Sequence, residues 1–184
     1  DGAGFIRALK EEGEFDPEGK TTLIIGAGGS AKAVSYHLLK NKISHLLLAN
    51  RTNIRAENLG ASLKSLGYEN IDFISLTGTE LELILSSKTP PDLIVNCTSL
   101  GMVGGPGPAR MAIPSHLIPQ SSLVCDLVYN PLFTPLLKGA IESGAQILTG
   151  LPMLIHQGAL AFHLWSNCEP PIQIMFEAAR TALE

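Results

Sequence analysis

The residues best suited to chemistry lie in one glycine-rich stretch early in the chain. A short apolar run at 23–25 predicts a buried parallel strand, and it stops at Gly-Ala-Gly-Gly-Ser-Ala, residues 26–31. This is the G-x-G-x-x-A form of the turn that binds dinucleotides. Gly26 permits the tight turn, Gly28 lets the backbone approach a pyrophosphate, and Ala31 lets helix and strand pack closely. The pattern predicts a phosphate site at the start of the next helix; the alternative is a tight turn without a ligand.

The residues after the second predicted strand indicate which dinucleotide would bind. A site for NAD places Asp or Glu about 20 residues beyond the glycines, on the ribose 2′-OH. This chain has Asn50 there, followed by Arg51 and, four residues further on, Arg55. A carboxylate would repel a 2′-phosphate, whereas an amide and guanidinium groups attract and hydrogen-bond it. The residues therefore favour NADP(H) over NAD(H); the alternative is that both arginines are solvated charges at a helix start.

Alternating apolar and helical patterns predict the elements that position these residues. Strands are predicted at 23–25, 45–49, 72–76, 92–96, 122–127 and 146–148, and helices at 1–13, 30–41, 54–66, 80–87, 135–143, 153–166 and 172–183. This order predicts an α/β fold, a Rossmann-like doubly wound parallel sheet with helices on both faces and a helical C-terminal tail. A glycine- and proline-rich segment at 101–119 is too long for a simple connector, and such loops are often functional.

Composition and charge exclude several classes of function. The chain has 184 residues, 45% hydrophobic and 16% charged, with a net charge of −4. These values are typical of one globular domain and argue against nucleic acid or an anionic membrane as the main partner. No run of about 20 apolar residues predicts a membrane span, and no signal peptide precedes the first strand. Because the chain begins with Asp1 rather than Met, we expect it to be part of a longer protein.

The cysteines and histidines favour neither a disulfide framework nor a metal site. Cys97, Cys125 and Cys168 are odd in number and scattered, so a reducing compartment such as the cytoplasm is expected. The histidines and cysteines show no metal-ligand spacing, and no metal is expected. His156 is tempting as an acid–base group, but a lone histidine on a helix is more often structural.

Further segments could line the same crevice because they follow predicted strands. Thr98 closes the fourth strand, although its hydroxyl could instead bond a local turn. Pro131 cannot continue a central strand, which places Tyr129 at the rim, where its hydroxyl could meet a substrate or simply pack. Gly150 lets the backbone approach a flat ring, and the neutral amide of Gln157 both donates and accepts, unless it is a solvated helix residue.

Together these motifs resemble the shikimate dehydrogenase family. The resemblance rests on residues 26–34, 50–56, 92–102, 126–137 and 150–165, in the family's order and spacing over nearly the whole chain. It implies that residues 1–184 form the NADP-binding Rossmann domain of an enzyme that reduces 3-dehydroshikimate to shikimate, in the route to chorismate and aromatic amino acids. It also implies an N-terminal substrate domain that is absent here, toward which the helical segments 1–13 and 153–184 would pack.

The resemblance also implies a role for each matching position. It places the pyrophosphate on Gly26, Ala27, Gly28, Gly29 and Ser30, the 2′-phosphate on Asn50, Arg51, Thr52 and Arg55, the nicotinamide beside Thr98, Leu127 and Gly150, and the substrate on Asp1, Tyr129 and Gln157. Asp1 and Gly2 match the second half of the family's Asn-Thr-Asp-Gly motif, so Asp1 becomes the aspartate of its catalytic Lys–Asp pair. From the residues alone, Asp1 would be a helix cap.

The sequence departs from the family in two places. The family often has Asp-Gly-Leu-Gly-Met where residues 149–153 read Thr-Gly-Leu-Pro-Met. Because proline is tolerated at an early helical position, we expect this departure to do little damage. The catalytic lysine and further substrate contacts belong to the absent domain. We therefore expect this chain to bind NADPH without turning over substrate.

Three alternatives remain open at this stage. The first is a quinate/shikimate dehydrogenase relative that uses NAD, and the second is a non-catalytic metabolite sensor or repressor domain on the same fold. The third is the NADPH domain of a glutamyl-tRNA reductase, which would share the glycine turn and Asn-Arg-Thr but gives no reason for residues 126–131 and 150–158. The sequence also leaves a homodimer open.

Overall fold

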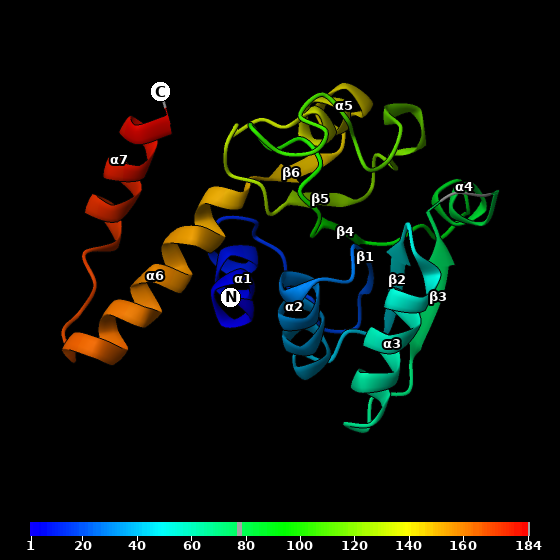
Figure 1. Cartoon of the computed structure of the whole chain (residues 1–184), viewed down its shortest axis with the longest axis horizontal. Coiled ribbons are helices and arrows are strands. Elements are labelled where there is room, and N and C mark those ends of the chain that lie inside the picture. Colours follow the sequence, from blue (N-terminus) through cyan, green and yellow to red (C-terminus); the bar gives the residue numbers. More distant parts are fainter. Residues whose placement is uncertain (77–78, 184) are drawn as a thin grey trace.

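The computed structural model describes residues 1–76 and 79–183 of the chain, so residues 77–78 and 184 of the predicted domain lie outside it. Six parallel strands form one sheet in the order β3-β2-β1-β4-β5-β6 (Figure 1). The strands are β1 Thr21–Ile25, β2 His45–Asn50, β3 Ile71–Ser75, β4 Leu93–Asn96, β5 Leu123–Asp126 and β6 Gln146–Leu148. This is the doubly wound order whose ligand crevice lies where the strand order reverses, here between β1 and β4.

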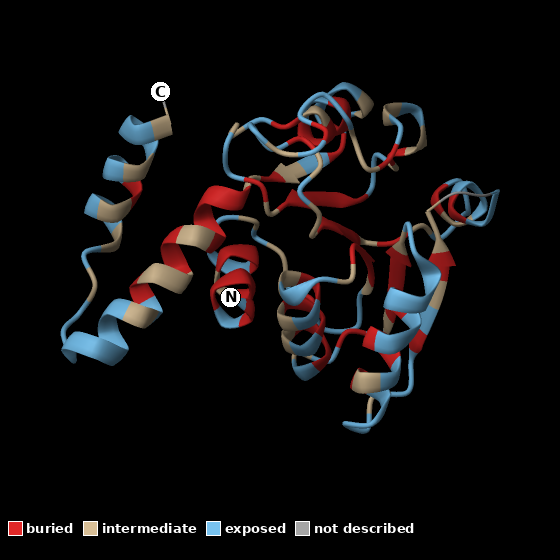
Figure 2. Cartoon of the chain, viewed as in Figure 1, coloured by how far each residue is buried: buried red, intermediate tan, exposed pale blue. Residues whose placement is uncertain are grey.

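Helices cover both faces of the sheet, as predicted. They are α1 Gly2–Glu11, α2 Gly29–Lys40, α3 Asn53–Lys64, α4 Thr79–Leu85, α5 Pro135–Ser143, α6 Gly150–Ser166 and α7 Ile172–Leu183, with a short 3₁₀ helix at Ser115–Leu117. One core joins α1, α2 and α3 to one face of the sheet, and a second core joins α4 and α5 to the other. Alternate residues of a strand therefore enter different cores: Ile24 packs in the first, and Leu23 and Ile25 in the second. Both sides of the central strands β1, β2, β4 and β5 are buried almost throughout (Figure 2), which explains their largely apolar sequences. The edge strands β3 and β6 expose Asp72 and Gln146.

Small residues allow α1 to lie closely against two other helices. A Cβ at Gly2 would fall 2.1 Å from His37 of α2, and a Cβ at Gly4 would fall 2.6 Å from the backbone nitrogen of Gln157 in α6. The two glycines therefore set how α1 sits between α2 and α6. The opposite side of α1 carries the charged residues expected from its amphipathic pattern.

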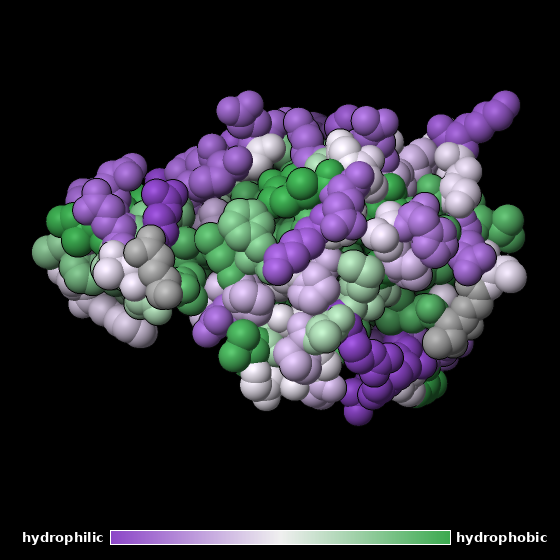
Figure 3. Space-filling view, turned by 90° about the horizontal axis from the view of Figure 1, so that it is seen from above, coloured by the Kyte–Doolittle hydropathy of each residue, from purple (hydrophilic) through white to green (hydrophobic). Residues whose placement is uncertain are grey.

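The last two helices extend away from the sheet (Figure 1). Phe176 is the buried residue of α7, in a small core with Leu151 and Ile155 of α6. Toward the end of α6, Leu164 and Trp165 are 80% and 88% exposed. In the view from above, hydrophilic side chains surround separate hydrophobic patches (Figure 3).

The predicted elements are confirmed, with differences at their ends. Helix α6 begins at Gly150 rather than at 153. The N–H groups of a first helical turn have no partner within the helix, so Pro152, which has no N–H, can stand there without breaking the helix. The segment 101–119 contains the 3₁₀ helix, which the sequence did not indicate, and it buries Ile113 and Ile118. None of the described helices is long and apolar enough to cross a membrane.

Candidate functional site

The glycine turn between β1 and α2 provides open space and free N–H donors. Gly26 has φ +113°, a conformation that L side chains rarely adopt. At Gly28 and Gly29, by contrast, an added Cβ would meet nothing within 4 Å. Gly28 is the N-cap of α2, and no side chain caps the helix, so its first N–H groups remain available. The turn therefore has the room and the donors that a pyrophosphate needs.

Two guanidinium groups stand at the start of the next helix. Strand β2 ends at Asn50, whose Nδ2 donates to the carbonyl oxygen of Thr52 over 2.8 Å. Arg51 and Arg55 are exposed, and no carboxylate in the described part of the chain forms an ion pair with either. Helix α3 begins at Asn53, and its N-cap residue makes no side-chain cap bond. Unpaired positive charge and an uncapped helix start both favour an anion here.

The glycine turn and the arginines line one cavity of about 290 Å³ at the carboxyl end of the sheet. Its lining residues are Gly26, Ala27, Gly28, Asn50, Arg51, Arg55, Leu76, Cys97, Thr98, Ser99, Leu100 and Pro106. A neighbouring cavity of about 400 Å³ is lined by Ser30, Cys97, Thr98, Ser99, Met102, Val103, Leu127, Val128, Tyr129 and Asn130. The segment Cys97–Ser99 belongs to both. Together they form a cleft that is basic at one end and lined by uncharged residues at the other, which suits an extended ligand.

The cleft brings together most of the residues predicted for a cofactor. Gly29, Thr52 and Gly150 line neither cavity, although Gly29 is the first residue of α2 and Thr52 is the N-cap of α3. At Gly150 an added Cβ would lie 2.5 Å from the carbonyl oxygen of Leu127. Its lack of a side chain therefore lets α6 pack against the segment after β5. The predicted contact of Gly150 with a flat ring stays a prediction.

The predicted substrate residues are more dispersed. Tyr129 lines the neighbouring cavity and is 43% exposed, at the rim, as expected. Asp1 precedes α1, is exposed, and makes no side-chain cap bond to that helix, so it does not act as the cap that its position alone suggested. Gln157 of α6 lies against Gly4 of α1. Gly4 is about one helical turn from Asp1 along α1. Asp1 and Gln157 line neither cavity, and their roles stay predictions.

His156 is held inside the protein. The residue is 0% exposed, and its Nε2 lies 3.0 and 2.9 Å from the two carboxylate oxygens of Glu12. The imidazole also meets the ring of Phe176 edge-on, with 5.9 Å between centroids. These contacts join α6 to the end of α1 and to α7, which agrees with the structural role expected for this histidine.

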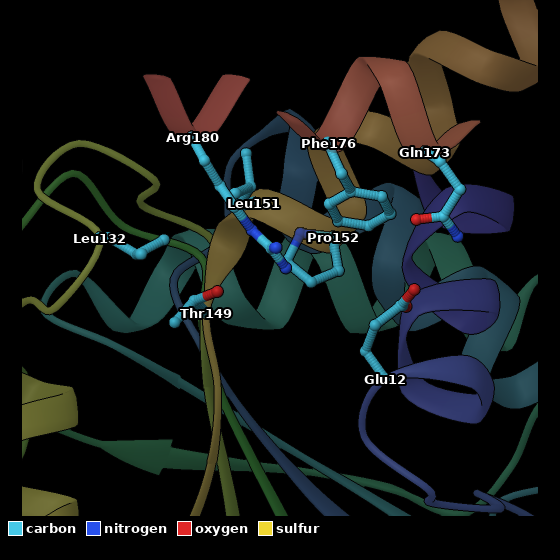
Figure 4. Close-up of a pocket in the computed structure, with 8 residues that line it drawn as sticks. All are labelled: Glu12, Leu132, Thr149, Leu151, Pro152, Gln173, Phe176 and Arg180. Atoms are coloured by element: carbon cyan, nitrogen blue, oxygen red, sulfur yellow. The ribbon is translucent and has the colours of Figure 1, made fainter. Parts of the chain in front are cut away.

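A further cavity beside the first turn of α6 is separate from the cleft. It has a volume of about 240 Å³ and is lined by Glu12, Leu132, Thr149, Leu151, Pro152, Gln173, Phe176 and Arg180. Arg180 reaches into it from α7, and Glu12 approaches from the end of α1 (Figure 4). No residue predicted to bind cofactor or substrate is among its lining residues.

The sequence interpretation missed a buried polar pair behind the cleft. Asp126 is 1% exposed. Its Oδ1 accepts from Asn96 Nδ2 over 2.9 Å and from the backbone nitrogen of Val128 over 3.1 Å, and its Oδ2 accepts from Thr134 Oγ1 over 2.6 Å. Burial raises the pKa of Asp126 to about 6, and the hydrogen bonds oppose this rise. The available signal was positional, since Asn96 and Asp126 each end a strand and the two strands are neighbours.

Cys97 lines both cavities, but its surroundings disfavour the reactive thiolate form of its side chain. Burial raises the pKa of its thiol well above the ordinary value, and the nearby Asp126 raises it further. A thiol in such an environment stays neutral and unreactive. Cys97 therefore contributes shape to the cleft.

The sequence of the chain matches those of known dehydrogenases. A family model described as shikimate / quinate 5-dehydrogenase matches residues 8–111, and one described as shikimate 5′-dehydrogenase C-terminal domain matches residues 150–180. A shikimate dehydrogenase (NADP(+)) of Methanopyrus kandleri is 42% identical over 178 residues, which are 97% of this chain and 60% of that protein. The chain spans about 60% of the length of the curated relatives it matches.

Two solved structures resemble the chain over nearly its whole length. Shikimate 5-dehydrogenase from Thermus thermophilus, in complex with NADP(H) and shikimate, superposes with a TM-score of 0.82 and is 35% identical, covering 99% of this chain and 62% of that one. Quinate dehydrogenase from Corynebacterium glutamicum, in complex with NAD, gives a TM-score of 0.83 at 31% identity, and the match covers 98% of this chain and 61% of that one.

Proposed function

Because the chain belongs to the shikimate / quinate 5-dehydrogenase family, we propose that it is the cofactor-binding part of an NADP-dependent shikimate dehydrogenase. The reaction is the reduction of 3-dehydroshikimate to shikimate, in the biosynthesis of chorismate and aromatic amino acids. The observation that carries the proposal is the cleft itself. Its open glycine turn leads to two unpaired guanidinium groups at one end and to Thr98, Leu127 and Tyr129 at the other.

The residues around the cleft suit the parts of NADPH in order. The turn at residues 26–30 holds the pyrophosphate with backbone N–H groups, and Asn50, Arg51, Thr52 and Arg55 hold the 2′-phosphate. The nicotinamide lies beside Thr98, Leu127 and Gly150. When bound, the cofactor supplies the hydride, while the residues of this chain bind and orient it.

The substrate end of the proposed site is incomplete in this chain. Asp1, Tyr129 and Gln157 contact the substrate, and Asp1 orients a lysine of an N-terminal domain that exchanges the proton with the substrate oxygen. Helices α1, α6 and α7 pack toward that domain. The strongly exposed Leu164 and Trp165 support this arrangement, since large apolar side chains clustered on a surface are typical of interfaces.

An NAD-dependent quinate/shikimate dehydrogenase is the second candidate, favoured by the likeness to the NAD-bound quinate dehydrogenase. Asn50 weighs against it, because a carboxylate on the ribose 2′-OH is the usual device for NAD. The cofactor preference of the isolated chain therefore separates the two.

The decisive experiment compares NADPH and NADH binding to the wild-type chain and to Arg51→Ala. We expect wild type to prefer NADPH, and Arg51→Ala to lose about tenfold or more of its NADPH affinity while NADH affinity changes by less than about twofold. Lys64→Ala is the matched control, because it removes one positive charge from the opposite end of α3. An equal loss of NADPH affinity in Arg51→Ala and Lys64→Ala would mean that only the overall charge of the chain matters. Unchanged affinities in Arg51→Ala would refute the assignment of Arg51 to the 2′-phosphate.

Catalysis by the chain alone provides a separate test. Without the lysine, the purified 184-residue chain should bind NADPH but show no NADP⁺-dependent oxidation of shikimate. Turnover that survives repurification would contradict the assignment of the proton-transfer residue to another domain.

A further inference from the structure

We propose that Asp126 is a positioning residue, whose carboxylate fixes the Thr98 turn and the segment 127–129 in the arrangement that the nicotinamide end of the cofactor requires. The inference deepens the proposed function and rests on it. Asp126 lies behind the wall of the cleft and lines neither cavity. It therefore acts through the residues that it holds.

The hydrogen-bond directions around Asp126 follow from backbone donors. The backbone N–H of Thr98 donates to Asn96 Oδ1 over 3.0 Å, and this bond orients the Asn96 amide. Its Nδ2 must then face Asp126 Oδ1, 2.9 Å away. The backbone N–H of Val128 can only donate to the same oxygen. Asp126 therefore has to accept on Oδ1 from both sides.

The second carboxylate oxygen reaches the start of α5. Thr134 is the N-cap of that helix and accepts from the backbone nitrogen of Leu137 over 3.3 Å, so its hydroxyl proton is free to donate to Asp126 Oδ2 at 2.6 Å. Thr134 is fully buried. Because every neighbour of the carboxylate donates, the ionised acid completes the network in a way that an amide cannot.

The network continues to a side chain of the cleft. The Thr98 hydroxyl donates to Asn96 Oδ1 over 2.7 Å and accepts from the backbone nitrogen of Leu100 over 3.2 Å. Its proton is thus committed, and it can offer a ligand only its remaining lone pair. The Asp126 carboxylate therefore joins, through Asn96, the Thr98 turn to the segment after β5, and both line the same cavity.

The test compares two ligands on the 184-residue chain. NADPH spans the cleft, whereas adenosine 2′,5′-bisphosphate carries only the adenosine and 2′-phosphate end. The amide of Asp126→Asn has one oxygen and one NH₂ group. In one orientation the NH₂ group faces the Thr134 hydroxyl, and in the other it faces the N–H donors of Asn96 and Val128, so one donor always meets another donor. We expect about tenfold weaker NADPH binding, with bisphosphate affinity within about twofold of wild type. Isothermal titration measures both affinities.

Two variants of Thr134 test whether the hydrogen bond to Asp126 causes the loss of NADPH affinity. Thr134→Ser keeps the donor and should bind both ligands like wild type, whereas Thr134→Val should show the same selective loss in a smaller degree. Asp92→Asn is the matched control, because Asp92 accepts from the backbone nitrogen of Thr21 at the amino-terminal end of the central strands and lines neither cavity of the cleft. This substitution should change neither affinity. If Asp126→Asn does not fold, Thr134→Val against Thr134→Ser decides the question.

The outcomes separate this inference from the proposed function. Wild-type binding of neither ligand would overturn the proposed function and the role of Asp126 with it. Wild-type binding of both, with NADPH affinity intact in Asp126→Asn and Thr134→Val, would overturn the positioning role alone. An equal loss for both ligands would also overturn it, because that result indicates a general structural defect.

Discussion

The α-carbon of Gly26 faces the backbone of Cys97, and a Cβ added to Gly26 would lie 3.1 Å from the Cys97 carbonyl oxygen. Gly26 also has φ +113°. Gly26→Ala should therefore lower the free energy of unfolding by about 1–3 kcal/mol and weaken NADPH binding as well. Urea denaturation measures the first effect and ligand titration the second.

The neighbouring Gly28 should behave differently. Its φ is −90°, and an added Cβ meets nothing within 4 Å, so Gly28→Ala should change stability by no more than about 1 kcal/mol. The same Cβ would occupy space reserved for the pyrophosphate, and NADPH affinity should fall sharply. A variant that is stable and still binds NADPH like wild type would show that the phosphates lie elsewhere.

The pH dependence of stability should reveal the buried Asp126. Its pKa is about 6 in the folded chain against an ordinary value of 3.8, so the folded state binds more protons between these values. Its contribution to stability is therefore greatest below pH 4 and is lost as the pH rises to about 6. The change is at most about 3 kcal/mol. The thiols of Cys97 and Cys125 nearby have raised pKa values and stay neutral throughout.

The variant Asp126→Asn separates the contribution of Asp126 to the pH dependence of stability from that of the other titrating groups. The difference in unfolding free energy between wild type and variant should shift in favour of the variant as the pH rises from 4 to 6, and should be flat above pH 7. Urea melts at matched pH values measure it. A pH-independent difference would mean that the carboxyl group titrates equally in both states.

Two adjacent glutamates should differ in their effect on stability. Glu12 bonds the buried imidazole of His156 at 2.9 Å, whereas Glu11 bonds the partly exposed Arg7 on its own helix and lies 3.8 Å from His156. Glu12→Ala leaves a buried ring nitrogen unsatisfied and should cost about 1–3 kcal/mol. Glu11→Ala should cost less than about 0.5 kcal/mol. Equal costs in urea denaturation would contradict the structural role of His156.

Local signals account for most of the fold that was predicted from the sequence. Helix α5 runs from Pro135 to Ser143 as predicted, because Thr134 caps it, proline begins it, and Gly144 at φ +81° ends it. The glycine turn and the arginines were likewise recognisable because each follows an apolar strand. The Asn96–Asp126 bond joins residues 30 positions apart, and sequence periodicity does not specify which side chains meet across strands.

Trp165 is the only tryptophan of the chain and is 88% exposed at the end of α6, so its fluorescence reports on the face proposed to meet another domain. In the isolated monomeric chain its emission should match that of solvated tryptophan and shift little when the protein unfolds in urea. Acrylamide should quench it as efficiently as free tryptophan. A blue shift that grows with protein concentration would instead indicate that a second copy covers this face, and a blue shift independent of concentration would mean that α6 and α7 bury it within the chain.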